Sequence, residues 1–513
     1  MQSLSSLSRR LPLVAAALLA GSVPLLSGLA HQGAATGILD REAIDALIAP
    51  ATRFDATEPG EDRPGGAATS RNPAINSNAF SHASGNIEFK KEFDFKIGNA
   101  VFRKQWVSAP ASTKSSDGLG PLYNARACQN CHLKDGRGHP PAANWPEEDA
   151  VSFLMRLSIP PQTEDDKRLL AEMRTKSVDD PVYGGQLQTL SIQGHEAEGK
   201  IRIDYQDVPV TLAGGEVAHL RKPEYRIEHL GYGPLDPRVM LSPRVAPQMI
   251  GLGLVELVSE AQILGYADPD DKNGDGISGK AQRVWSLEED RVMLGRFGYK
   301  AGAPSLSQQA AMAFNGDIGI SSPLIPHDAG DCTSKEPVCL DAPHGSDPAT
   351  GEPEVGEKLF KLVSFYSRNL AVPARRTPGD PQILKGKSLF YAAGCVSCHR
   401  PKFMTGPSEE QPHLAHQLIW PYADFLLHDM GEGLADDAPE GLADGREWRT
   451  APLWGIGLTQ IVNGKANFLH DGRARTLTEA VLWHGGEAQK ARDAFAGFTP
   501  EDRAALLVFL NSL

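Results

Sequence analysis

Two copies of one pentapeptide constrain this chain more than any other feature. Residues 128–132 (CQNCH) and 395–399 (CVSCH) both read Cys-x-x-Cys-His and use four of the six cysteines. In such a run the two thiols form thioethers with a porphyrin and the histidine binds the iron, so the pattern is typical of c-type haem. A zinc half-site or a redox dithiol would explain the cysteines but not a histidine in both copies. The sequence therefore predicts two covalently bound haem c groups, attached at Cys128, Cys131, Cys395 and Cys398, with His132 and His399 as iron ligands.

Residues 1–30 predict a signal peptide. Two arginines precede a long apolar stretch, and the stretch ends in GLA before His31, which fits a cleavage site. A membrane anchor is the alternative, although two prolines interrupt the apolar stretch. No later stretch is long and apolar enough to span a bilayer. Because c-type haem is attached after export, we expect a periplasmic protein with no membrane span in the mature chain.

Composition limits the partners. The net charge of -13 argues against nucleic acid and favours a basic or neutral partner, such as a small electron-donor protein of the cytochrome c or cupredoxin type. The remaining cysteines, Cys332 and Cys339, are eight residues apart counted inclusively, and an oxidising compartment would join them in a disulfide. Two free thiols are the alternative.

The order of motifs predicts an internal duplication. Gly98-x-x-Val101-Phe102 before the first haem motif echoes Gly386-x-x-Leu389-Phe390 before the second, and RVAPQMIGLGL (244–254) echoes RTAPLWGIGL (449–458). Between about 183 and 232, polar and apolar residues alternate as in strands. We therefore expect a mainly α fold of two cytochrome c-like haem domains in tandem, the first with a small antiparallel β insertion.

The expected boundaries follow from this pattern. A mobile leader is predicted over 31–78, an N-terminal haem domain over 79–375 and a C-terminal haem domain over 376–513. Helical periodicity predicts helices at 148–158, 164–176, 249–264, 285–295, 305–313, 355–370, 384–394, 475–484 and 499–512.

The second haem has a candidate for its other axial ligand. His484 ends an expected helix among apolar residues, where an imidazole without a partner would be costly. His470, His428 and Met430 compete for this role. Asp471 and Arg473 suit haem propionates, with a surface ion pair as the alternative.

For the first haem no second ligand is placed by pattern. His82, His139 and His195 are available, but an open iron face is what peroxide needs. Glu256, inside the apolar run LVELV, is then a candidate catalytic acid–base, since burial would raise the pKa of its carboxyl. The alternative is an exposed glutamate on an amphipathic helix. Trp106, Trp448 and Trp454 could bridge the two haems, but we favour core packing for them.

Residues 268–282 resemble the first half of an EF-hand loop. Asp271, Asn273 and Asp275 fall at ligand positions before Gly276, but Gln282 stands where that loop has glutamate. Calcium binding and a plain Asx-turn loop both stay open.

Several of these stretches together resemble the di-haem oxidoreductase (peroxidase, "thiol oxidoreductase") family of the bacterial dihaem cytochrome c peroxidase superfamily. The resemblance covers most of residues 80–513 and is carried by GLGPLYNARACQNCHLKDGRG, NGDGISGK, PYADFLLHDMG, EWRTAPLWGIGL and FLHDGRARTLTEAVLWHGGEA. It implies His484 as the axial ligand of an electron-transfer haem in the C-terminal half. It also implies that peroxide reacts at the N-terminal haem beside a glutamate, with calcium between the domains.

The resulting expectation is an enzyme, a haem-dependent oxidoreductase. Electrons would enter through the C-terminal haem and hydrogen peroxide would be reduced at the N-terminal haem. A dihaem electron-transfer cytochrome is one alternative, and a peroxide- or oxygen-dependent oxidase of an organic or protein substrate is another. A thiol oxidoreductase activity finds no support, because haem attachment uses the paired cysteines.

Overall fold

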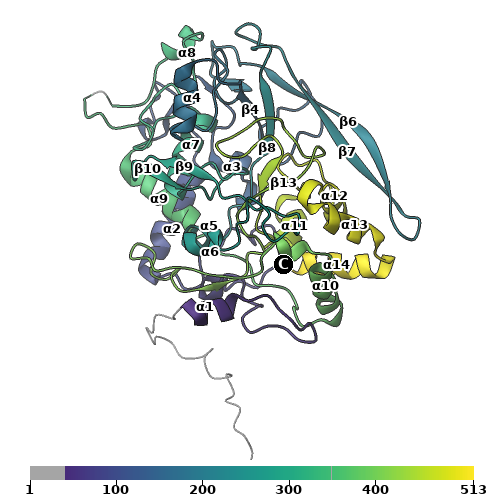
Figure 1. Ribbon diagram of the computed structural model, residues 1–513. Coiled ribbons are helices and arrows are strands. Elements are labelled where there is room, and N and C mark those ends of the chain that lie inside the picture. Colours follow the sequence, from purple (N-terminus) through teal and green to yellow (C-terminus); the bar gives the residue numbers. More distant parts are fainter. Residues whose placement is uncertain (1–40, 348) are drawn as a thin grey trace, which may run out of the picture. The chain divides into compact units, whose positions relative to one another are not determined.

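Short helices and strands alternate with long loops in the computed structural model, which describes residues 41–347 and 349–513 (Figure 1). The expected signal peptide and the first part of the expected leader lie outside the described residues. The helices are α1 (Arg41–Ile48), α2 (Glu92–Phe102), α3 (Cys128–Cys131), α4 (Glu164–Ala171), α5 (Leu252–Glu256), α6 (Glu260–Leu264), α7 (Leu306–Ile318), α8 (Pro337–Leu340), α9 (Glu357–Arg368), α10 (Pro381–Ala392), α11 (Thr459–Asn463), α12 (Leu477–Leu482), α13 (Gln489–Gly497) and α14 (Pro500–Ser512). The strands are β1 (Val107–Ser108), β2 (Asp117–Leu119), β3 (Leu122–Tyr123), β4 (Phe153–Ser158), β5 (Leu190–Ser191), β6 (Lys200–Thr211), β7 (Val217–Glu228), β8 (Met240–Val245), β9 (Arg283–Ser286), β10 (Arg291–Leu294), β11 (Phe403–Met404), β12 (Leu418–Ile419), β13 (Leu427–Asp429) and β14 (Glu447–Arg449).

The expected mainly α fold of two cytochrome c-like domains is wrong. The chain is 29% helical and 17% strand, and the strands form many small sheets. Two expected helices are strands instead: 148–158 contains β4, which pairs with β8, and 285–295 spans the β9–β10 hairpin. Short apolar windows fit both helix and strand periods, so pairing with another segment decides between them.

Two helix pairs repeat beside the two haem motifs. Helix α2 crosses α9, and a Cβ at Gly98 would lie 2.3 Å from the Leu362 carbonyl oxygen. Helix α10 crosses α14, and a Cβ at Gly386 would lie 2.0 Å from the Ala505 carbonyl oxygen. The two glycines of the sequence echo therefore serve the same purpose, because only glycine lets the backbones come this close.

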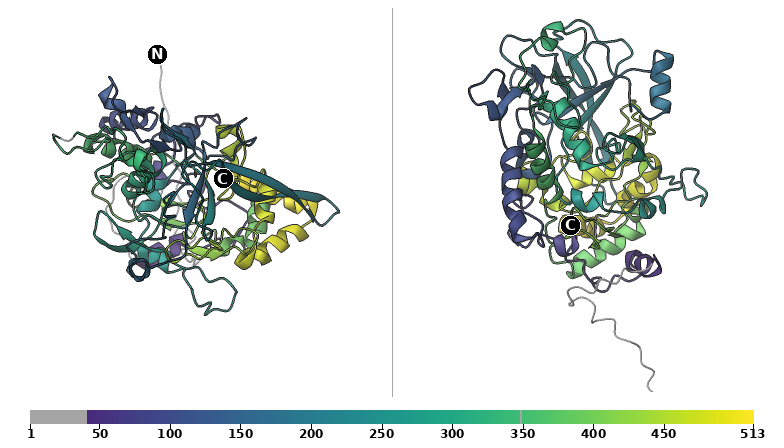
Figure 2. Two further views of the ribbon diagram at one scale, coloured as in Figure 1. Left: turned by 90° about the horizontal axis from the view of Figure 1, so that it is seen from above. Right: turned by 90° about the vertical axis from the view of Figure 1, so that its left-hand side faces the viewer.

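The β insertion is a long antiparallel hairpin. Strand β6 pairs with β7 from Lys200↔Glu228 to Thr211↔Val217. Figures 1 and 2 show the hairpin beside the C-terminal helices. Its tip is fixed there, since the Ala213 amide donates to the Ala496 carbonyl at 2.9 Å. The insertion of the first half thus covers part of the second half.

The two halves share one hydrophobic core. Buried residues from both sides of the expected boundary at 375–376 pack together, among them Phe80, Ile250, Leu254, Phe403 and Trp454. Residues 47–513 accordingly form a single compact unit.

The second part of the expected leader is packed into this unit. Glu61 is 1% exposed and forms ion pairs with Lys387 and Arg375. Lys387 also pairs with Glu58 at 2.8 Å, so this segment is anchored on α10. Composition alone could not show this packing, because Ala, Pro, Gly and Asp are common both in mobile loops and in loops that pack against a core.

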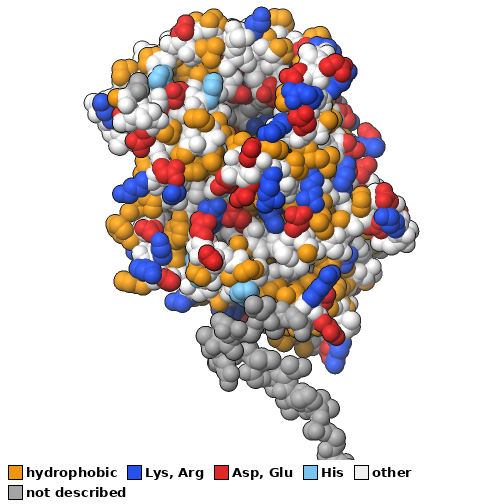
Figure 3. All heavy atoms as spheres, turned by 60° about the vertical axis from the view of Figure 1, so that its left-hand side comes forward, with side chains coloured by type: hydrophobic (Ala, Val, Ile, Leu, Met, Phe, Trp, Pro, Cys, Tyr) orange, Lys and Arg blue, Asp and Glu red, His pale blue; other side chains and the backbone are white. Residues whose placement is uncertain are grey.

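One face of the molecule carries mixed charge. In Figure 3 acidic and basic side chains are interspersed, so this face offers no patch of one sign for a partner. Within the described residues, no helix combines the length and hydropathy that crossing a membrane requires.

Candidate haem-binding sites

The first haem motif presents its histidine as a neutral ligand. The two cysteines lie on α3, and His132 follows directly. The His132 Nδ1–H donates to the Pro247 carbonyl at 2.7 Å, which leaves Nε2 with its lone pair. Burial lowers the pKa of His132 to about 4. The imidazole is therefore uncharged at neutral pH and oriented for metal binding.

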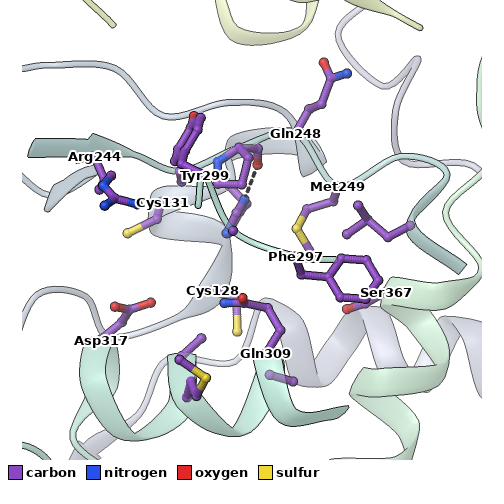
Figure 4. Close-up of a pocket in the computed structure, with 18 of the residues that line it drawn as sticks. Cys128, Cys131, Arg244, Gln248, Met249, Phe297, Tyr299, Gln309, Asp317 and Ser367 are labelled. Carbon is purple, nitrogen blue, oxygen red and sulfur yellow. Dashed lines mark hydrogen bonds between the residues drawn. The ribbon is translucent and has the colours of Figure 1, made fainter. Parts of the chain in front are cut away.

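A cavity of about 230 Å³ lies against this motif (Figure 4). Cys128, Cys131 and His132 form one part of its wall. Helix α7 lies opposite, and Gln309 and Asp317 project from it into the view of Figure 4. Most of the lining is apolar and includes Phe102, Leu154, Met249, Phe297, Met312, Phe314 and Trp454. An apolar cavity beside two thiols and an imidazole fits a porphyrin.

Six basic side chains also line the cavity: Arg137, Arg156, Lys176, Arg244, Arg296 and Arg449. Lys176 and Arg244 pair with Glu440 at 3.0 and 3.2 Å. Burial alone would raise the pKa of Glu440, but Lys176 and Arg244 outweigh burial and lower it. Arg156, on β4, acts on the buried Asp317 carboxyl and lowers its pKa against the effect of burial, and its guanidinium also suits a haem carboxylate. Sequence reasoning missed these residues because separate strands and loops bring them together.

Among the described residues, the lining of this cavity offers no second imidazole. Of the described residues that line the cavity, His132 is the one histidine, and His82, His139 and His195 lie elsewhere. Met249 and Met312 supply thioethers, and Gln309 supplies a side-chain amide. An open face on the first haem iron stays a prediction.

The second motif brings two imidazoles together. Cys395 begins the 3-10 turn Cys395–Ser397 and Cys398 follows it, and the His399 Nδ1–H donates to the Tyr422 carbonyl at 2.8 Å. His484 follows α12, and its Nδ1–H donates to the Ala480 carbonyl at 2.8 Å. Burial, with a contribution from His484, lowers the pKa of His399 to about 4. Both imidazoles are thus neutral, near each other and able to offer Nε2 to one iron, and the ligand role of His484 stays a prediction.

Of the competitors, His428 has no lone pair to offer. Its Nε2 contacts the Asp424 carboxylate at 2.8 Å and its Nδ1 contacts the Glu487 carboxylate at 2.6 Å. Burial would lower the pKa of His428, but the two carboxylates raise it well above its usual value. Cys398, Asp424 and His428 form a set with metal-ligand spacing, yet the Cys398 sulfur belongs to the haem motif.

His470 and Met430 lie in the surrounding core. The His470 ring stacks on Trp448 with centroids 3.8 Å apart, and its buried Nε2 has no hydrogen-bond partner among the described residues, although it lies 3.8 Å from the Asp471 carboxylate. Burial lowers the pKa of His470 to about 3. Met430 packs on the same cluster as Trp448.

Asp471 and Arg473 form a buried pair and not a surface one. Arg473 Nε donates to Asp471 at 2.7 Å, and the Tyr225 hydroxyl donates to the same carboxylate at 2.6 Å. Burial would raise the pKa of Asp471, but Arg473 outweighs it, and the pKa falls to about 2. The guanidinium lies over the ring of Trp483, next to His484. A propionate role for this pair stays a prediction.

Glu256 lies beside the first cavity but points elsewhere. Its neighbour Val255 lines the cavity, whereas the Glu256 carboxylate accepts the Leu306 amide at 2.8 Å and pairs with Arg368 at 2.6 Å. The carboxylate therefore caps α7 and holds α9. The acidic residues that do line the cavity are Asp317 and Glu440. Burial raises the pKa of Asp317, a signal that no sequence pattern carried.

The 268–282 loop uses its acidic side chains within its own turns. Asp271 accepts the Gly276 amide, Asn273 accepts the Asp275 amide, and Asp275 accepts the Ile277 amide. These contacts are what an Asx-turn loop predicts. Three acidic ligands that converge on one point are not found here among the described residues.

The six cysteines form one disulfide and two haem-motif pairs, as their spacing predicts. Cys332 and Cys339 form a disulfide, which confirms that pairing. Cys128, Cys131, Cys395 and Cys398 are free thiols. The four sulfur atoms needed for haem attachment are thus available.

The model of the family described as "Di-haem oxidoreductase, putative peroxidase" matches residues 60–513. The chain belongs to this family. Haem is therefore the cofactor that its two motifs and first cavity are expected to hold, and the protein is an oxidoreductase. No curated protein matches the chain. A solved structure, "Kuenenia stuttgartiensis Hydrazine Synthase Pressurized with 20 bar Xenon", is 13% identical, with a TM-score of 0.27 over 69% of this chain and 90% of that chain. This likeness is too weak to support an inference.

Proposed function

We propose that this di-haem oxidoreductase is a periplasmic c-type peroxidase. It would reduce hydrogen peroxide in the first cavity with electrons that enter through the second haem site. The observation that carries the proposal is the asymmetry of the sites. The second site offers two imidazoles, His399 and His484, whereas the described lining of the first cavity offers His132 alone.

The reaction is H₂O₂ + 2e⁻ + 2H⁺ → 2H₂O, and the haem groups would supply the electrons when bound. The protein's part is to bind peroxide, exclude water and hold protons. The Gln309 amide on α7 can hydrogen-bond a small polar molecule in the cavity. Burial raises the pKa of the Asp317 carboxyl although Arg156 opposes the shift, and Asp317 is the better acid–base candidate of the two acidic lining residues, since Glu440 is ion-paired.

Export and covalent attachment complete the proposal. The Cys332–Cys339 disulfide supports an oxidising compartment. None of the four motif cysteines forms a disulfide with a described residue, so each sulfur can form a thioether bond to haem. Fractionation of cells that express the full chain, followed by mass spectrometry of the denatured periplasmic protein, should show two added haem masses.

A second candidate is an electron-transfer cytochrome. Met249 and Met312 line the first cavity, and a thioether ligand would close the first iron to peroxide. This alternative predicts two low-spin irons and no reaction with peroxide.

The deciding experiment uses the haem-loaded protein. Optical and electron paramagnetic resonance spectra are recorded before and during peroxide titration, and peroxide turnover is followed with a reduced small cytochrome c. We expect one high-spin iron in the oxidised or half-reduced protein and donor-dependent turnover. Two low-spin irons without turnover would establish the carrier, and peroxide consumption that needs an organic or protein substrate instead would establish an oxidase.

A further inference from the structure

The last turn of α7 is held by a side chain from a distant part of the chain. Asp317, in this turn, lines the first cavity (Figure 4), and its Oδ1 accepts a hydrogen bond from Gln186 Nε2 at 2.9 Å. Gln186 is 0% exposed and is not among the described residues that line the cavity. Its side chain therefore reaches Asp317 from behind the cavity wall.

The backbone at Gln186 belongs to the same wall. Gln186 forms an antiparallel bridge with Arg156 of β4, and Arg156 lines the cavity. Residues opposite each other in an antiparallel pair place their side chains on one face. The Gln186 amide and the Arg156 guanidinium therefore lie on the same side of this pair, the side that Asp317 contacts.

The disulfide loop fixes the turn that carries Gln186. Asp331 Oδ2 accepts the Gly185 and Gln186 amides at 2.8 and 3.0 Å. Gly184 has a φ of +65°, and a Cβ there would lie 2.6 Å from the Asp331 carboxyl group. Only glycine allows this approach. The turn thus has one backbone geometry from which the Gln186 side chain can extend.

Oxygen acceptors outnumber the hydrogens of the Gln186 amide. Nε2 carries two hydrogens, but it contacts Asn124 Oδ1 at 2.5 Å, the Gly316 carbonyl at 3.0 Å and Asp317 Oδ1 at 2.9 Å. Three oxygens around one atom identify that atom as the amide nitrogen. Because Oδ1 of Asp317 is tied to this amide, Oδ2 is the carboxyl oxygen left to face the cavity.

We propose that Gln186 is a positioning residue for Asp317: it ties one carboxyl oxygen behind the wall and so presents the other to a molecule in the cavity. The inference rests on the proposed function, in which Asp317 is the acid–base group for peroxide. It goes further because Gln186 does not line the cavity itself and acts through the carboxyl. Loss of its N–H should change both the direction of this carboxyl and its affinity for a proton.

The direction of that change follows from the groups that act on Asp317. Burial raises its pKa, whereas Arg156 and the hydrogen bond from Gln186 lower it. The pKa values of Cys128 and Cys131 on α3 respond to the Asp317 charge, but thiols that have become thioethers do not titrate, and α7 carries no other titratable side chain. Haem carboxylates are common to all variants. Removal of the Gln186 N–H should therefore raise the pKa of Asp317.

The test compares haem-loaded Gln186→Met with Gln188→Met. Gln188 is the matched control: it is 2% exposed, and its Nε2 donates to the carbonyls of Gly316 and Gln186. The acid limb of the kcat/KM profile for peroxide reports the acid–base group of the free enzyme. Its midpoint should rise by about one pH unit in Gln186→Met, which lowers kcat/KM about tenfold below that pH. Gln188→Met should keep the wild-type midpoint.

Infrared spectra recorded across a pH titration give a readout that does not depend on turnover. The C=O band of the protonated Asp317 carboxyl is identified by its loss in Asp317→Asn. It should persist to higher pH in Gln186→Met than in the wild type or Gln188→Met. If Gln186→Met does not fold, Gln186→Glu replaces it and should shift the band in the same direction, because it sets a second carboxyl beside Asp317.

The two readouts separate this inference from the function on which it rests. A wild type without peroxide turnover refutes the proposed function, and the infrared band alone then decides whether Gln186 positions Asp317. The positioning role is overturned if Gln186→Met leaves the band at its wild-type midpoint, or if Gln188→Met shifts it equally.

Discussion

Substitution of Glu256 separates a structural carboxylate from a catalytic one. In Glu256→Gln the amide oxygen can still accept the Leu306 N–H, but the charge that faces Arg368 is lost. The Arg368 side chain is 10% exposed, and removal of one partner of a buried ion pair costs about 3–5 kcal/mol. Arg368 keeps the Ser307 hydroxyl at 3.0 Å and Glu410 at 3.6 Å, so we expect the lower end, about 3 kcal/mol.

Turnover should respond in the opposite order to stability, so that Asp317→Asn loses more activity than Glu256→Gln. Loss of a general acid–base lowers turnover by about 10²–10⁴-fold, and we expect Glu256→Gln to lose less than about tenfold because its carboxylate does not line the cavity. Asp317→Asn is the matched variant, since it keeps an acceptor for Gln186 and lines the cavity. It should lose about 10²-fold or more in turnover with little change in stability.

The assays are denaturant unfolding followed by haem absorbance and steady-state peroxide reduction with saturating donor. Equal haem content of both variants is the control. If Glu256→Gln keeps its stability within about 0.5 kcal/mol and loses a hundredfold in turnover, the carboxylate reaches the cavity and our reasoning is refuted.

Three further predictions concern the second site, the anchored segment and the disulfide. His484→Gly should convert the second iron from low to high spin, whereas His470→Asn should not; an unchanged spectrum in His484→Gly would exclude it as the ligand. Glu61→Gln should destabilise the protein by about 3–5 kcal/mol at neutral pH. Burial raises the pKa of Glu61, but Arg375 and Lys387 outweigh it, and the net shift is downward. A lowered folded-state pKa contributes stability above the unfolded value of about 4.5 that is lost as pH falls through the folded value. The wild-type advantage over Glu61→Gln should therefore shrink in unfolding curves below about pH 4.5, and a constant gap would contradict the ion-pair account. Removal of the Cys332–Cys339 disulfide with serines at both positions should cost about 2.5 kcal/mol by loop entropy. Unchanged stability would show that the disulfide does not fix this loop.

The sequence by itself determined the sites where local spacing carries the chemistry. The Cys-x-x-Cys-His runs need their residues within five positions, so the haem motifs could be identified without a structure. The repeat of Gly98 and Gly386 was also visible, because each glycine stands three residues before an aliphatic residue followed by phenylalanine. The pairing of Cys332 with Cys339 followed from the four other cysteines being assigned.

Tertiary structure alone decided what depends on contacts between distant segments. Arg156, Arg244 and Gln309 line one cavity although 153 residues separate the first from the last. Glu256 lies in an apolar run of the sequence, which made its carboxyl a catalytic candidate. In the structure its contact with Arg368, 112 residues away in the sequence, turns the carboxylate away from the cavity. The fold class failed for the same reason, since pairing of β4 with β8 overrode a helical window. Periodicity reports which face of a segment is apolar, whereas the partner that covers that face is set by the whole chain.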